Sequence, residues 1–218
     1  MSQPPDNPLR PEHFAREDDL PDPEFYREAR LVTHIDDAAI AAASRFYGQM
    51  LPEGGAVLDM MSSWVSHLPR EKHYAEVVGL GMNGTELSKN DQLTRWVVHD
   101  LNEDPRLPFE DDCFDGAVVT VSVQYLTRPV EVFTDVGRVL KAGAPFILTY
   151  SNRCFPTKAV AIWRVLGDRE HADLIALYLR LSGAFSQAEA LDLSPNPGGS
   201  DPLYAVYANA LPTVQPAS

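Results

Sequence analysis

Polar side chains lie at the ends of several short apolar runs in this chain. Asp59 closes the first run, Asp100 follows the third and Ser122 follows the fourth. If the runs are parallel strands, their carboxyl ends meet at one edge of the sheet, where open α/β folds bind ligands. Carboxylate and hydroxyl groups at such an edge can hydrogen-bond the polar parts of a nucleotide-like cofactor. The spacing therefore indicates a small-molecule site.

The loop after the first run departs from the usual design of such a site. A nucleotide-binding α/β domain places a glycine-rich loop where its first strand turns into a helix. Residues 60–64 instead read Met-Met-Ser-Ser-Trp, without glycine. How this loop treats a cofactor is therefore the central functional question.

Apolar runs that barely alternate, separated by helical segments, position these residues. Strands are expected over 56–60, 76–82, 95–99, 116–121 and 145–149. Helices are expected over 25–30, from a capping-box-like start at 33–36 to about 50, over 85–90 and 129–140, and from about 157 to 181. Two further runs, 188–193 and 203–208, are joined by a Pro- and Gly-rich loop that is typical of a hairpin. The pattern predicts an α/β fold with a doubly wound, mostly parallel seven-stranded sheet ending in an antiparallel hairpin.

Composition limits the class of protein. A chain of 218 residues with 44% apolar residues fits one domain with a sizeable core. The formal charge of -13 disfavours binding to phosphate backbones, so no nucleic-acid partner is expected. The two cysteines fit a reducing compartment, and no apolar run approaches the ~18 residues that span a bilayer. We expect a cytoplasmic protein without a membrane partner, and the histidine spacing predicts no metal site.

The ends of the chain differ from its middle. Residues 1–23 contain six prolines among acidic and polar residues, which predicts a disordered or surface-draped tail. A single domain is expected over 24–210, followed by a second tail over 211–218.

Two segments in the second half resemble a known family. Residues 107–115 read Leu-Pro-Phe-Glu-Asp-Asp-Cys-Phe-Asp, and residues 138–144 read Arg-Val-Leu-Lys-Ala-Gly-Ala. They are similar to the LPFxDxxFD and RVLKPGG segments of class I S-adenosylmethionine-dependent methyltransferases, in the type-11, small-molecule group. The resemblance covers roughly 51–208. It implies a Rossmann-like methyltransferase domain that transfers a methyl group from S-adenosylmethionine to a small molecule.

The resemblance also implies a set of cofactor contacts. Asp100 matches the acidic position that holds the adenine amino group, although it could equally cap a turn. Gly81 stands at the acidic position for the ribose hydroxyls, and the Asn83 amide would replace that acid in part. The cofactor-binding candidates are Asp59, Met60, Ser62, Asn83, Asp100, Leu101 and Ser122.

Three hypotheses stand for the glycine-free loop. In the first, Ser62, Ser63 and Ser66 open the next helix and cradle S-adenosylmethionine in a modified pose. In the second, Trp64 and the methionines fill the cofactor's volume, which leaves a non-catalytic methyltransferase-like binding or scaffold protein. In the third, the loop holds a nucleotide-like ligand for another chemistry.

The sequence marks a catalytic group only weakly. Methyl transfer from a sulfonium depends on alignment and exclusion of water, and it needs at most one general base. Tyr125 and His67 are the candidates, although Tyr125 could simply pack a helix edge and His67 could be a loop or core histidine. The apolar residues of 155–181 could serve the core, a homodimer surface or a substrate pocket.

Overall fold

Seven strands form one sheet in this computed structural model, which describes residues 7–212. The predicted tails are covered only in part, because residues 1–6 and 213–218 lie outside the described residues. The strands are β1 (Ala56–Met60), β2 (Glu76–Gly81), β3 (Arg95–Val98), β4 (Gly116–Thr120), β5 (Pro145–Tyr150), β6 (Glu189–Asp192) and β7 (Tyr204–Asn209).

The strand order is β3-β2-β1-β4-β5-β7-β6. Strands β1 to β5 pair in parallel, whereas β7 runs antiparallel to both β5 and β6. The prediction of a doubly wound sheet with a terminal antiparallel hairpin is confirmed. The order reverses between β1 and β4, and such a switch point is where open α/β sheets form a crevice for ligands.

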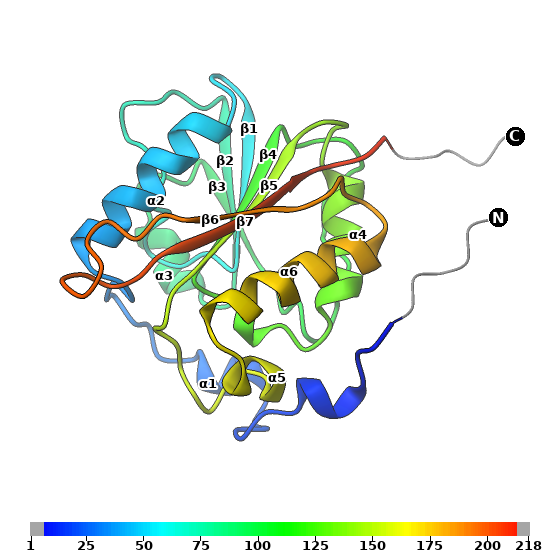
Figure 1. Cartoon of the computed structure of the whole chain (residues 1–218). Helices are drawn as coiled ribbons and strands as arrows, with labels where there is room; N and C mark the ends of the chain where they lie inside the picture. Colours follow the sequence, from blue (N-terminus) through cyan, green and yellow to red (C-terminus); the bar gives the residue numbers. More distant parts are fainter. Residues whose placement is uncertain (1–6, 213–218) are drawn as a thin grey trace, which may run out of the picture.

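Helices cover both faces of the sheet. They are α1 (Asp22–Phe25), α2 (Asp37–Met50), α3 (Gly84–Lys89), α4 (Pro129–Val139), α5 (Ala161–Val165) and α6 (Asp168–Ser182), with short 3-10 turns η1 (Pro11–Phe14) and η2 (Val123–Tyr125). Figure 1 shows α2 and α3 on one side of the sheet and α4 and α6 on the other. No helix among residues 7–212 is long and apolar enough to cross a membrane.

Alternate residues of the central strands pack into two hydrophobic cores, one on each face of the sheet. On β5, Ile147 packs in the core under α2, whereas Phe146 and Leu148 pack in the core under α4 and α6. This alternation follows from the pleat, which turns successive side chains to opposite faces. Because both faces are covered, the central strands read as unbroken apolar runs in the sequence.

The helical predictions differ from the structure at three places. The predicted capping box at 33–36 does not form, because α2 begins at Asp37 and the Asp36 side chain caps it by accepting from the Ala39 N–H. The expected helix over 25–30 is replaced by the short α1, which ends at Phe25. The helical stretch within 157–181 is two helices, because the Glu170 side chain accepts a hydrogen bond from the Gly167 backbone N–H and starts α6 anew. The apolar stripe of α6 is buried in the core, whereas Phe155, at the start of the same predicted segment, lines the cavity described below.

Candidate functional site

A cavity opens at the carboxyl ends of β1 to β4. It encloses about 1120 Å³ of empty space, open solvent included, between the strand ends and an N-terminal segment, 22–34. Figure 1 shows this segment and α5 across the lower end of the sheet. All nine residues predicted from the sequence as binding or catalytic candidates line it: Asp59, Met60, Ser62, His67, Asn83, Asp100, Leu101, Ser122 and Tyr125. The structure thus brings together residues that are separated by up to 66 positions in the chain.

The connection from β1 to β2 contains no helix. Residues 61–75 form turns and extended chain, and the Ser62 backbone N–H donates to the Leu80 carbonyl at 2.8 Å. Ser62 therefore extends the pairing of β1 with β2 instead of capping a helix. The expectation that the serines open a helix is wrong, because this backbone bond takes the loop onto the neighbouring strand. Met61, at φ 53°, makes the turn in the left-handed region.

Gly81 is explained by the same loop. A Cβ atom added to Gly81 would lie far inside contact distance of the Ser62 carbonyl oxygen, so no side chain fits at the end of β2. The missing glycines after β1 and the missing acid after β2 are therefore one packing arrangement. The sequence shows them as two separate departures from the family pattern.

Asp59 is buried under this loop. Its carboxylate accepts a hydrogen bond from the Ser62 hydroxyl at 2.6 Å. Burial raises the pKa of Asp59 to about 7, against the opposing effect of the hydrogen bonds from Ser62 and Ser66. Asp59 therefore carries only part of a negative charge at neutral pH, which reduces its cost inside the domain.

Trp64 fastens the loop to the N-terminal segment. Its indole N–H donates to the Val32 carbonyl at 2.9 Å. Met60 and Met61 line the cavity, but Trp64 is not among the described residues that do. The hypothesis that the Trp64 side chain fills the cofactor's volume is wrong, because the indole lies outside the cavity and hydrogen-bonds the Val32 carbonyl.

Asn83 lines the cavity with all its side-chain groups in use. Its Oδ1 accepts from the N–H groups of Thr85 and Glu86 and so caps α3. Its Nδ2 donates to the carbonyls of Tyr26 and Arg27 at 2.8 and 3.2 Å. An amide offers two donors and two lone pairs, so Asn83 has nothing left for a ligand in this arrangement.

Glu86 is a carboxylate that the sequence analysis missed. It lies in the first turn of α3, is 8% exposed and lines the cavity. Its Oε1 accepts from the Arg30 backbone N–H at 2.7 Å, and burial raises its pKa. An acidic residue soon after the β2 strand was the only sequence signal for it.

Asp100 combines the two roles that the sequence left open. Its Oδ1 accepts from the Asn102 N–H at 2.9 Å, which is the turn-capping contact. The residue also lines the cavity beside Leu101. Asn102 in turn donates to Asp22 and to the Tyr125 carbonyl, so this turn joins the strand ends to the N-terminal segment.

His67, Ser122 and Tyr125 differ in what they offer a ligand. The His67 Nδ1 and Ser122 Oγ atoms are buried without a hydrogen-bond partner in the described part of the chain. Burial, followed by nearby His34, lowers the pKa of His67 to about 4, so the imidazole is neutral at pH 7. The Tyr125 hydroxyl accepts from the Phe155 N–H at 2.8 Å, and burial raises its pKa to about 12. Tyr125 therefore stays protonated near neutral pH, and its hydroxyl can donate a hydrogen bond but cannot act as a base.

Backbone strain lies next to these groups. Val121, immediately before Ser122, has φ 44°. A β-branched residue is rarely found in the left-handed region, and such strain gathers at functional sites.

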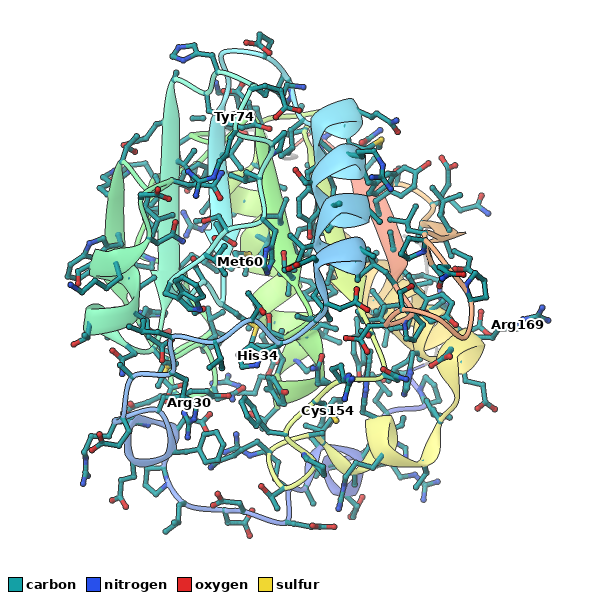
Figure 2. All side chains as sticks on the ribbon, turned by 90° about the vertical axis from the view of Figure 1, so that its left-hand side faces the viewer. Arg30, His34, Met60, Tyr74, Cys154 and Arg169 are labelled. Atoms are coloured by element: carbon teal, nitrogen blue, oxygen red, sulfur yellow. The ribbon has the colours of Figure 1, made fainter. Side chains whose placement is uncertain are left out.

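The N-terminal segment supplies the second wall of the cavity. Its residues there include Asp22, Tyr26, Arg30 and His34. Figure 2 shows Arg30 and His34 on this segment, beyond the strand end marked by Met60. The sequence analysis placed residues 24–34 in the domain, with a helix over 25–30, but it assigned none of them to the site.

Comparison with known proteins agrees with this architecture. A family model described as a methyltransferase domain matches residues 61–148. The chain is 27% identical over 130 residues, 57% of its length, to a biotin biosynthesis bifunctional protein, BioHC, from Teredinibacter turnerae, of which the match covers 22%. It is 36% identical over 78 residues, 33% of its length, to the methyltransferase PhqN from Penicillium fellutanum, of which the match covers 24%. The chain thus matches about a quarter of the length of these curated relatives.

A solved structure shows the same fold. Geranyl diphosphate C-methyltransferase from Streptomyces coelicolor superposes with a TM-score of 0.58 at 14% sequence identity, over 87% of this chain and 97% of that one. The sequence match, the strand order and the ligand crevice point the same way: residues 61–148 match the methyltransferase-domain model, and the chain has the fold of the solved S-adenosylmethionine-dependent methyltransferases.

Proposed function

We propose that this protein binds S-adenosylmethionine and transfers its methyl group to a small molecule. The observation that carries the proposal is the gathering of all seven predicted cofactor residues around one cavity at the switch point of the sheet. His67 and Ser122, two residues that line this cavity, each have a buried polar atom without a partner in the described part of the chain, which supports a ligand with hydrogen-bonding groups.

Two carboxylates would hold the nucleoside part of the cofactor. Asp100 and Leu101 would contact the adenine, as the family resemblance implies. Glu86 would take over the ribose hydroxyls, since Gly81 cannot carry a side chain beneath Ser62 and the Asn83 amide is fully engaged. Asp100 lines the cavity from the turn after β3, and Glu86 lines it from α3.

The rest of the cavity suits a reaction driven by proximity. Bound S-adenosylmethionine would supply an activated methyl group on its sulfonium. The chain's own part is to orient the acceptor, exclude water and accept a proton where the acceptor must lose one. Neutral His67 would accept that proton at Nδ1, while Tyr125 would donate a hydrogen bond. The enclosed, partly aromatic cavity favours a small molecule over a polymer.

Calorimetric titration with S-adenosylmethionine and S-adenosylhomocysteine tests the proposal. We expect saturable binding that weakens at least several-fold in Asp100→Ala and in Glu86→Gln. Asp104→Ala is the matched control, because Asp104 caps a turn through the Arg106 N–H at 2.9 Å, as Asp100 does through Asn102, but does not line the cavity.

A non-catalytic binding or scaffold role is the second candidate. The connection after β1 favours this role. In nucleotide-binding α/β folds a helix begins here and its N-terminus faces the ligand, whereas residues 61–75 of this chain contain no helix. Failure of both cofactor forms to bind at millimolar concentration would reject the methyltransferase proposal and leave this role.

A further inference from the structure

Arg30 is a cation in the cavity wall with little to bind. Its guanidinium has five N–H donors, and Nη2 donates to the Phe25 carbonyl at 2.9 Å. This is the only hydrogen bond that the guanidinium makes within residues 7–212. Its Nη1 atom is buried without a partner, and no carboxylate in the same residues forms an ion pair with it.

Aromatic rings hold the guanidinium in place. Its carbon lies 4.5 Å from the ring centre of Phe25, 5.4 Å from that of Phe155 and 5.8 Å from that of Tyr26. Phe155 also packs on Tyr125, with ring centres 6.0 Å apart. The rings remove water from the cation and fix its plane, and a desolvated cation attracts an anion more strongly than one in water.

Within residues 7–212, the carboxylates near Arg30 form no ion pair with its guanidinium, although burial raises the pKa of Glu86 and the Arg30 charge opposes that rise. Asp22 lies in the same wall, but Arg16 holds both of its oxygens at 2.7 and 2.9 Å. Glu86 meets Arg30 through the Arg30 backbone N–H and not through the guanidinium. Burial, together with Arg30 itself, lowers the pKa of His34, which leaves that imidazole uncharged beside it.

We propose that Arg30 is the carboxylate-binding residue of this cavity and that the bound carboxylate belongs to a molecule lying against the aromatic wall. A guanidinium edge matches the two oxygens of a carboxylate, and one free cation balances one charge. The inference deepens the proposed function and rests on it for the identity of the cofactor.

Two molecules could bring this carboxylate. One is the amino-acid part of S-adenosylmethionine, and the other is an acidic aromatic acceptor. Calorimetry with four probes separates them: S-adenosylhomocysteine, 5′-methylthioadenosine (which lacks the amino-acid part), benzoate and the uncharged benzamide.

We compare the unmodified protein with Arg30→Gln, and with Arg30→Lys, which keeps the charge but loses the planar fork. Arg70→Gln is the matched control, since Arg70 is 68% exposed and pairs with Asp91 on the surface. Thermal unfolding of each variant shows whether it is folded.

If the cofactor brings the carboxylate, Arg30→Gln weakens the binding of S-adenosylhomocysteine by about tenfold or more and leaves the binding of 5′-methylthioadenosine unchanged. If the acceptor brings it, benzoate binds the unmodified protein more tightly than benzamide, and Arg30→Gln removes the difference. In either case, the affinity of Arg30→Lys for the carboxylate-bearing probe should lie between those of the unmodified protein and Arg30→Gln.

Equal binding of every probe to the folded Arg30→Gln variant would overturn the inference. Failure of the proposed function looks different, because S-adenosylhomocysteine and 5′-methylthioadenosine would then both fail to bind the unmodified protein. The benzoate comparison would still test Arg30 in that event.

Discussion

The two walls of the cavity are built by different forces. The strand ends are fixed by backbone ladders and by two apolar cores, and even the loop after β1 joins the sheet through the Ser62 N–H. The N-terminal segment is fixed by charged and polar side chains, above all Lys158, Arg16, Asn83 and Trp64. The first wall resists change at the backbone, whereas the second depends on a few side chains.

This contrast identifies the N-terminal segment as the wall through which a ligand would enter. A wall held by side-chain bonds can detach without unfolding the sheet, because local openings follow regions with few apolar contacts. The N-terminal wall should therefore open before the wall formed by the strand ends.

The largest effect is expected for Lys158→Met. The ammonium group is fully buried and donates to the Leu20 carbonyl at 2.7 Å, with Asp18 and Asp22 carboxylates at 3.4 and 3.3 Å. Without the ammonium group these buried carboxylates and carbonyls lose their partner, and we expect the free energy of unfolding to fall by about 3–5 kcal/mol. Hydrogen exchange should accelerate over residues 8–36 and not in β1 or β4.

Lys141→Met is the control for that measurement, since Lys141 is about half exposed and pairs with Asp115 at the surface. Equal acceleration of the sheet amides in Lys158→Met would show that the two walls do not separate.

Gly81→Ala tests the wall formed by the sheet. Because the new Cβ would strike the Ser62 carbonyl, the loop or the strand end must shift, and we expect a loss of about 1–3 kcal/mol in urea unfolding. Gly84→Ala is the matched control, since its Cβ would meet Val98 at an ordinary 3.4 Å. Similar losses in both variants would contradict the close approach of the loop to β2.

Asp59→Asn tests the buried acid in the same wall. The pKa of Asp59 is about 7 in the folded chain and 3.8 ordinarily. Between these values the unfolded chain has lost the proton while the folded chain keeps it, so the free energy of unfolding falls as pH rises. Asp59→Asn removes this fall, and its stability relative to the unmodified protein should increase with pH by up to about 1.4 kcal/mol per unit.

His67 gives that experiment an internal check. Its pKa is about 4 in the folded chain and 6.5 ordinarily, so its contribution to stability rises with pH over that range, opposite to Asp59. His67→Asn should therefore lose stability relative to the unmodified protein as pH rises; asparagine also tolerates the positive φ of 53°. A flat difference for both variants would argue against the burial of these groups.

The smallest effect is expected for Trp64→Phe, at the junction of the walls. It removes only the indole donor to the Val32 carbonyl, worth about 1 kcal/mol. Faster hydrogen exchange should be confined to the loop after β1 and to residues near Val32. If exchange changes in neither place, Trp64 does not join the two walls.

Most of the fold could be predicted from the sequence. The strand over 56–60 and the final hairpin follow from apolar runs and a Pro- and Gly-rich turn, which are local signals. The binding edge followed as well, because parallel strands align their carboxyl ends and so bring Asp59 and Asp100 to one cavity. The roles of these residues in binding stay predictions.

Three features needed the tertiary structure. Gly81 and the glycine-free loop are one arrangement because Ser62 lies over the end of β2, a contact between residues 19 positions apart. Glu86 became a site residue only when α3 was placed beside the cavity. The wall carrying Arg30 was predicted only as a short helix of the domain, and its place at the cavity depends on distant residues such as the buried Lys158, which donates to the Leu20 carbonyl. Periodicity and turn chemistry are local signals, and they determined the sheet. Close approach, charge pairing and desolvation act between segments that are distant in the chain, so only the tertiary structure decided them.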